Sequence, residues 1–203
     1  MATRLKILLA VFALVLIWTG CDFGDDDSQP DCAIYPAQAT SPYVLPYNVG
    51  EGYFVGQTTN HGGVQKFAID LLMPIGTEVV AIEDGAVVKI EESFVDGDHT
   101  PGHENFVFVE HGDGSVARYV HLTQNGAVVD LFDRVVQGDV IGLSGDTGNS
   151  TEPHLHFDVT LCCCVDAGEY NELPCGQTLP LSFSNTEEHS CGLELGVTYL
   201  ALP

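Results

Sequence analysis

Basic residues are scarce in this chain of 203 residues: six Lys and Arg stand against 29 Asp and Glu, which gives a formal net charge of -23. Such an excess of negative charge argues against nucleic acid and anionic membrane surfaces as partners. Apolar residues make up 45% of the chain and aromatic residues 9%, which is enough for a packed core. The composition therefore excludes a wholly disordered acidic protein.

Long hydrophobic runs are also missing, apart from one run of 12 residues at positions 7–18. A membrane-spanning helix needs about 20 apolar residues, so this run is short for a stable span. It follows Arg4 and Lys6 and precedes Thr19-Gly20-Cys21. This order is typical of a secretory signal over residues 1–20. Its end resembles a bacterial lipobox, which predicts a lipid anchor at Cys21; ordinary signal cleavage nearby and an uncleaved anchor are the alternatives.

The signal predicts export to the cell envelope, in the periplasm, as a membrane-anchored lipoprotein. Residues 21–40 are expected to form an acidic disordered tether. With Cys21 lipidated, six of the seven cysteines remain, which allows up to three disulfides in an oxidising compartment. A structural zinc site made of cysteines is disfavoured, because no Cys-x2-Cys pair is present.

Amphipathic helices of ten or more residues are absent after the signal, and short β-like runs broken by Gly, Asp and Asn take their place. Without helices to connect parallel strands, the fold class is predicted as all-β, with an antiparallel sheet. The main domain is expected over residues 41–165, followed by a Cys-containing extension over 166–203 that adds one or two strands. The clearest predicted strands are residues 66–72, 78–82, 86–91, 106–110, 116–122, 140–143, 154–161 and 179–183.

Histidine and aspartate stand out at a few positions in these strands. His154 and His156 are two residues apart, so their side chains share one face of a strand. Asp70 lies within an apolar run, where a carboxylate is costly unless a cation or hydrogen bonds satisfy it. His61 lies just upstream in a Gly-flanked loop, and His121 lies near a strand end. The plainer interpretation of each is a solvent-facing or structural side chain.

Two His and one Asp form a three-ligand metal site with an open position, which suits catalytic zinc and non-haem iron. A cupin is disfavoured, because Thr160 and Leu161 occupy the positions where its first metal motif requires Glu.

The chain resembles the M23 peptidases, the LytM or lysostaphin type, over residues 41–160. The resemblance rests on several motifs in the right order: SPYVLPY at 41–47, FAIDLLMPIGTEVVA at 67–81, DGAVV at 84–88, VEHGDG at 109–114, YVHL at 119–122, GDVIGLSGDTG at 138–148 and PHLHF at 153–157. It implies a twisted antiparallel sheet with an open metal-binding groove. It also implies hydrolysis of peptide stems or cross-bridges of bacterial peptidoglycan.

Carried over by position, the resemblance implies that His61, Asp70 and His156 bind one Zn2+ per chain. His121 and His154 would be the catalytic pair that does not bind the metal. His61 and Asp70 are nine positions apart, whereas the family's tightest form is His-x3-Asp, so the loop between them departs from that form.

Two other functions stay open. A non-catalytic M23-like protein could bind peptidoglycan or regulate another hydrolase, although all five family positions are filled here. A carrier or sugar-phosphotransfer barrel is disfavoured by the export signal and by the lack of a lipoyl-type Lys. His99 and His103 are expected in a loop at the groove edge, and His111 and His189 at the surface. The sequence leaves the oligomeric state open.

Overall fold

The computed structural model describes residues 32–59, 61–161 and 178–203. The predicted signal, Cys21, and Cys162, Cys163, Cys164 and Cys175 lie outside the described residues. Within the described part, no helix is long and apolar enough to cross a membrane. The helices there are 3-10 turns: η1 Cys32–Ile34, η2 Gln38–Thr40 and η3 Gly63–Gln65.

The described residues form two antiparallel sheets, which confirms the predicted fold class. The larger sheet has eight strands in the order β11-β1-β2-β10-β6-β5-β4-β8, and the smaller has three in the order β3-β9-β7. The strands are β1 Gly52–Gln57, β2 Ile69–Leu72, β3 Glu78–Val80, β4 Gly85–Glu91, β5 Phe106–His111, β6 Ser115–Val120, β7 Leu122–Ala127, β8 Arg134–Val135, β9 Val140–Ser144, β10 Leu155–Leu161 and β11 Thr198–Leu200.

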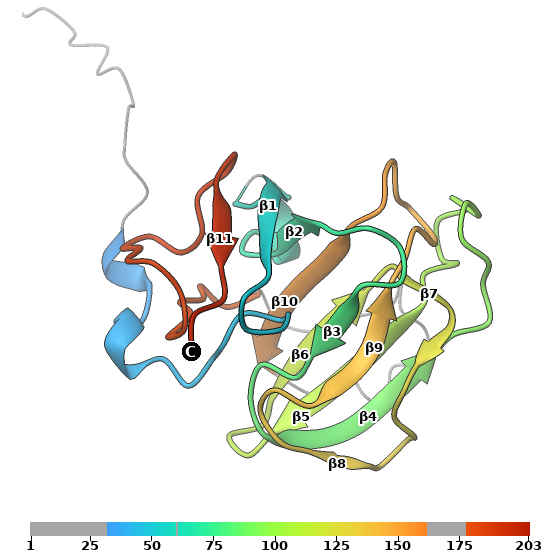
Figure 1. Ribbon diagram of the computed structural model, residues 1–203, viewed down its shortest axis with the longest axis horizontal. Coiled ribbons are helices and arrows are strands. Elements are labelled where there is room, and N and C mark those ends of the chain that lie inside the picture. Colours follow the sequence, from blue (N-terminus) through green and yellow to red (C-terminus); the bar gives the residue numbers. More distant parts are fainter. Residues whose placement is uncertain (1–31, 60, 162–177) are drawn as a thin grey trace, which may run out of the picture.

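The main core lies between the two sheets. In Figure 1 the small sheet lies in front of β6, β5 and β4. Apolar side chains from both sheets join one buried cluster, for example Val79 and Ile141 from the small sheet and Val109 and Tyr119 from the large one. Strand side chains alternate between faces, so the polar residues between these core positions point to the other face of the large sheet. The site described below opens among them.

The segments that flank the predicted main domain lie beside each other. Cys32 and Cys191 form a disulfide with Cα atoms 4.5 Å apart. The side chain of Gln38 donates hydrogen bonds to the backbone carbonyls of Thr186 and Glu187. Figure 1 shows these N-terminal and C-terminal segments together at one side of the molecule. Residues 32–40 of the predicted tether are therefore held in place by a covalent link and specific hydrogen bonds.

Seven of the eight predicted strands are present, with shifted ends. The exception is residues 179–183, where no strand forms. This segment is nevertheless part of the core, because Leu181 and Phe183 are buried there. The described residues of the extension contribute one strand, β11, which pairs with β1. Inside β7, Asn125 adopts a positive φ of 53° and the pairing with β9 is irregular.

Candidate active site

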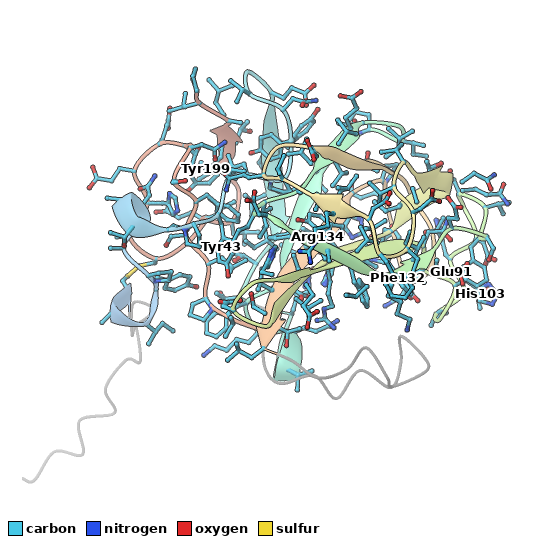
Figure 2. All side chains as sticks on the ribbon, turned by 90° about the horizontal axis from the view of Figure 1, so that it is seen from below. Tyr43, Glu91, His103, Phe132, Arg134 and Tyr199 are labelled. Atoms are coloured by element: carbon cyan, nitrogen blue, oxygen red, sulfur yellow. A yellow bond between two sulfur atoms is a disulfide. The ribbon has the colours of Figure 1, made fainter. Side chains whose placement is uncertain are left out.

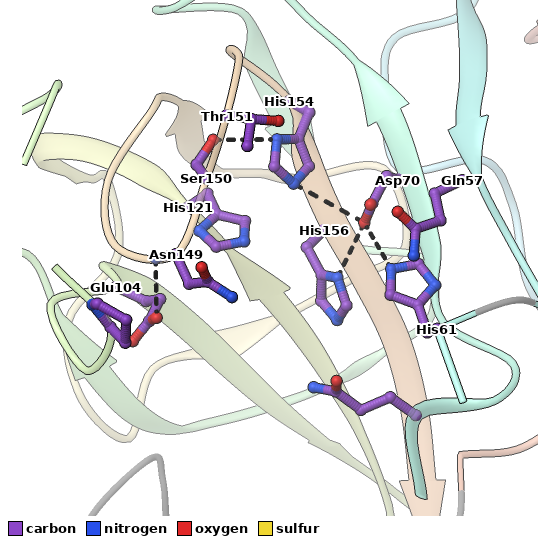
Figure 3. A pocket seen from close by; sticks show the side chains of 12 residues that line it. Gln57, His61, Asp70, Glu104, His121, Asn149, Ser150, Thr151, His154 and His156 are labelled. Carbon is purple, nitrogen blue, oxygen red and sulfur yellow. Dashed lines mark hydrogen bonds and ion pairs between the residues drawn. The ribbon is translucent and has the colours of Figure 1, made fainter. Parts of the chain in front are cut away.

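A polar cleft of about 410 Å³ opens where β2, β10 and the end of β6 meet (Figure 3). All five residues that the sequence singled out for a metal site and its chemistry line this cleft. Its lining residues are Gln57, His61, Gln65, Asp70, Pro101, Glu104, His121, Asn149, Ser150, Thr151, His154 and His156. The cleft therefore concentrates imidazole, carboxylate and amide groups in one partly enclosed space.

Asp70 and His156 face each other because their strands pair in register. Asp70 on β2 is the direct antiparallel partner of His156 on β10. Ile69 and Leu71 on either side of Asp70 are buried in the core, so Asp70 points to the opposite face. Its Oδ1 lies 2.9 Å from Nδ1 of His156. Alternation along two adjacent strands thus places a carboxylate and an imidazole at the floor of the cleft.

His61 reaches the same place from a loop. Gly62 and Gly63 adopt φ values of 76° and 53°, a left-handed conformation that glycine tolerates at little cost. The chain then forms η3 before it enters β2. This path brings Nε2 of His61 to 3.1 Å from Oδ1 of Asp70. The nine-residue spacing between His61 and Asp70 is thus compatible with direct contact between the two side chains.

The contact between His61 and Asp70 has the geometry of two ligands that share a cation. Nδ1 of His61 lies 2.8 Å from the carbonyl oxygen of Thr58, so the N–H of a neutral ring is used there. Nε2 then carries a lone pair that faces the carboxylate of Asp70. Two acceptors at this distance repel each other unless a metal ion or an additional proton lies between them. The donor set therefore fits a divalent cation, and the ligand atoms of His61, Asp70 and His156 all lie within 4.8 Å of one another.

The electrostatics of this cluster favour a negatively charged Asp70 and a positively charged His156. Burial opposes ionisation of Asp70, but the hydrogen bond and the positive charge of His156 outweigh it and hold the pKa of this carboxyl well below its usual range. Burial lowers the pKa of His156, but hydrogen bonds to Asp158 and Asp70 outweigh it and raise the pKa to about 9. Without a metal, a proton on His156 therefore balances the carboxylate.

His121 occupies the short connection between β6 and β7. Its φ of 64° is left-handed, which is uncommon for a residue with a side chain and turns the chain sharply at this point. Nδ1 lies 2.6 Å from the carbonyl oxygen of Thr147, so it donates its proton there and leaves Nε2 free to accept one. Burial, together with nearby His154 and His156, lowers the pKa of His121 to about 3. The ring is therefore neutral near pH 7.

His154 lies beside His121, with the two ring centroids 4.6 Å apart. Its Nδ1 lies 2.8 Å from the carbonyl oxygen of Glu152 and donates to it. Its Nε2 lies 3.8 Å from Oδ1 of Asp70 and so faces the cleft. Figure 3 shows both imidazoles next to the His61, Asp70 and His156 cluster. Two imidazoles with a fixed Nδ1–H thus present Nε2 atoms beside a cation-binding cluster.

The other predicted histidine positions have mixed outcomes. Pro101 and Glu104 line the cleft, as expected for a loop at its edge. His103 in the same loop lies on the outside of the molecule (Figure 2). The prediction that His111 and His189 are surface residues is wrong, because both are buried. Both ring nitrogens of His189 bond to backbone groups, and Nδ1 of His111 bonds to the carbonyl oxygen of Asp84, which reduces the cost of burial.

Sequence reasoning missed a buried ion pair behind the cleft. Arg118 on β6 and Asp158 on β10 are direct cross-strand partners, and two hydrogen bonds join them. Asp158 lies two residues after His156 in an apolar run, the same signal that drew attention to Asp70. Applied to Asp158, that argument would have predicted a cation or a hydrogen-bond partner for this carboxylate as well.

Comparison with known proteins relates the sequence of this chain to a family. The sequence model of Peptidase family M23 matches residues 64–166. This match includes Asp70, His121, His154 and His156, whereas His61 lies three positions before it. The family-model match therefore does not cover His61, and its place in the site is supported by its geometry.

Curated relatives match about half of the chain. An uncharacterized metalloprotease of Buchnera aphidicola is 39% identical over 46% of this chain and 22% of its own length. The peptidoglycan DD-endopeptidase ShyA of Vibrio cholerae is 39% identical over 44% of this chain and 19% of its own length. The glycyl-glycine endopeptidase ALE-1 of Staphylococcus capitis is 38% identical over 55% of this chain and 28% of its own length. The matched segment thus spans less than a third of each relative, while the family model covers half of this chain. The chain belongs to peptidase family M23.

Proposed function

We propose that this protein is a zinc-dependent metalloendopeptidase that hydrolyses peptide stems or cross-bridges of bacterial peptidoglycan. One observation carries the proposal: the ligand atoms of His61, Asp70 and His156 converge within 4.8 Å in a cleft that also contains His121 and His154. Two histidines and one carboxylate with an open position for substrate are a typical catalytic zinc set. His61 Nε2, Asp70 Oδ1 and His156 Nδ1 would hold one ion per chain.

In this proposal the metal ion, His121 and His154 have separate roles in peptide hydrolysis. When bound, Zn2+ supplies the Lewis acidity that activates water and polarises the scissile carbonyl. Peptide hydrolysis also needs a group that takes a proton from the attacking water and a group that protonates the leaving amine. His121 and His154 present Nε2 to the cleft and serve these two needs, or one of them stabilises the developing oxyanion. Their Nδ1–H bonds to backbone carbonyls keep both rings in the required tautomer.

The substrate class rests on the relatives and on the sequence. ShyA is a peptidoglycan DD-endopeptidase, and ALE-1 is a glycyl-glycine endopeptidase. The predicted export signal over residues 1–20 and lipid anchor at Cys21 would keep this chain within reach of the cell wall. The net charge of -23 offers no attraction to the carboxylates of peptidoglycan, so binding would depend on contacts within the cleft.

Digestion of purified peptidoglycan tests the proposal. The zinc-loaded protein is expected to release peptide fragments whose masses identify one cleaved bond, and a chelator is expected to abolish their release. Added zinc should then restore cleavage. Binding to peptidoglycan without fragment release would instead support the non-catalytic alternative and contradict the proposed hydrolase.

Zinc binding near pH 7 is expected to release about one proton per chain. Burial lowers the pKa of His156, but the hydrogen bonds to Asp158 and Asp70 raise it to about 9, so the metal-free ring is protonated at neutral pH. The proton must leave before Nδ1 binds the metal. Affinity should therefore rise with pH until about pH 9 and fall roughly tenfold for each pH unit below it.

Calorimetric titration in two buffers of different ionisation enthalpy measures this proton release. Affinity that does not change between about pH 6 and pH 8 would contradict His156 as a ligand. Full zinc occupancy that persists near pH ~4 would do the same, because every ligand histidine must be neutral.

A further inference from the structure

The Arg118–Asp158 pair lies directly behind His156 on the floor of the cleft. Nε and one terminal nitrogen of Arg118 each donate a hydrogen bond of 2.7 Å to a different carboxylate oxygen of Asp158. Asp158 is 0% exposed and Arg118 is 5% exposed. This two-pronged geometry fixes the carboxylate in position and orientation. Nothing in the hydrolytic chemistry proposed above uses it.

The same carboxylate faces the second ring nitrogen of His156. Oδ2 of Asp158 lies 3.4 Å from Nε2 of His156, while Nδ1 of the same ring faces Asp70. Nε2 is buried and makes no hydrogen bond to any described residue, and the carboxylate of Asp158 at 3.4 Å faces it. The imidazole is thus held between two carboxylates, one in the cleft and one behind it. Asp158 is the acceptor in reach for a proton on Nε2.

The chemistry of metal binding requires such an acceptor. A neutral His156 that offers the lone pair of Nδ1 to a metal carries its proton on Nε2. A buried N–H is costly unless it finds an acceptor. Histidines that bind metals commonly donate this second N–H to a carboxylate, which sets both the tautomer and the ring orientation. A buried carboxylate in turn needs a positive partner, and Arg118 supplies it.

We propose that Asp158, fixed by Arg118, is a positioning residue that holds His156 as the Nε2–H tautomer with Nδ1 turned toward the metal. The proposal rests on the proposed zinc site and adds a requirement for how that site is held. The competing explanation is a structural one, in which the ion pair only joins β6 to β10. The two explanations differ in what happens when both charged residues are replaced together.

Replacement of Asp158 separates the two explanations. Asp158→Asn is expected to weaken zinc binding about 10–100-fold, measured by competition with a chromogenic chelator. The double variant Arg118→Met with Asp158→Leu removes both charges and leaves no buried ion unpaired, so its fold is expected to persist. Its zinc affinity should still be about 10–100-fold weaker. Glu110→Gln is the matched control, because it removes one negative charge from an exposed position on β5, and its affinity should match the wild type.

The absorption spectrum of Co2+ bound in place of zinc gives a second readout that does not depend on activity. Bands of the Asp158 variants should shift relative to the wild type, because the His156 ring is no longer held in one orientation. Wild-type zinc affinity in the double variant would overturn the proposal and leave the structural explanation.

A measurement on the wild-type protein needs no variant to fold. Long-range nitrogen–proton NMR spectra of the zinc-loaded protein should show His156 with its proton on Nε2, protected from exchange. A spectrum with the proton on Nδ1 would overturn the proposal. A wild-type protein that binds no zinc at all would instead refute the proposed function, so the two failures are distinguishable.

Discussion

Replacing His121 with Ala is expected to lower kcat by about 10²–10⁴-fold while zinc stays bound. His121 does not belong to the converging ligand set, but its Nε2 is free and its ring is neutral at working pH. Loss of this imidazole removes proton transfer without removing the metal. Peptide release from peptidoglycan and zinc content, measured on the same sample, test both halves of this expectation.

His103→Ala is the matched control for His121→Ala. His103 lies in the loop at the cleft edge, but its ring stacks on Phe94 and bonds to Asp98 on the outside of the molecule. Its replacement should leave turnover within about twofold of the wild type, as is usual for surface positions. Normal turnover in His121→Ala would remove His121 from the mechanism.

Replacing His156 with Ala is expected to abolish zinc binding and activity together. His156 is one of the three proposed ligands. Its loss should therefore weaken zinc affinity by more than about 100-fold, which is the largest loss expected for a residue that only supports a ligand. Zinc content after dialysis and residual peptide release are the measurements. His99→Ala is a suitable control, because His99 is exposed and bonds to Asp146 outside the ligand set. Full zinc content in His156→Ala would contradict the ligand assignment.

The two replacements together distinguish the roles that the geometry implies. A ligand variant that loses the metal cannot report on proton transfer, whereas a variant that keeps the metal and loses turnover can. The His121 and His156 rings are only 5.9 Å apart between centroids. Distinct outcomes at two such close positions would therefore reflect chemistry and not general damage to the cleft.

The sequence predicts local geometry in this protein better than distant contacts. His154, His156 and Asp70 follow from the two-residue alternation of a strand, which needs no knowledge of the rest of the fold. The convergence of His61 does not follow, because it depends on the path of a loop through Gly62 and Gly63. The family match starts only at residue 64, so the structure supplies the argument for His61.

The strands of the fold also differ in how far the local sequence predicts them. Strands with clear apolar patterns, such as β5 and β10, are predictable from sequence. The strand β11 is short and is stabilised by pairing with β1, which lies far away in the chain. Residues 179–183 have a strand-like pattern because Leu181 and Phe183 fill the core, yet they form no strand. Burial can therefore give an apolar pattern to a segment that is not itself a strand.

The structure of the segment around Cys32 also depends on contacts with residues that are distant in the sequence. An acidic, polar stretch predicts disorder up to residue 40, but the disulfide to Cys191 and the bonds of Gln38 order its second half. The local sequence of residues 32–40 does not identify Cys191, which lies 159 positions away, as the disulfide partner of Cys32. The contact between Arg118 and Asp158 likewise cannot be predicted from the local sequence, because it depends on the pairing of β6 with β10 in the sheet.

Anomalous diffraction at the zinc absorption edge is the most direct test of the proposed site. The account predicts a single peak per chain, with the ion about 2.0–2.2 Å from Nε2 of His61, Oδ1 of Asp70 and Nδ1 of His156. His121 and His154 should lie beside the ion without binding it. A peak held by other residues, or one that leaves out His61 or His156, would contradict the account.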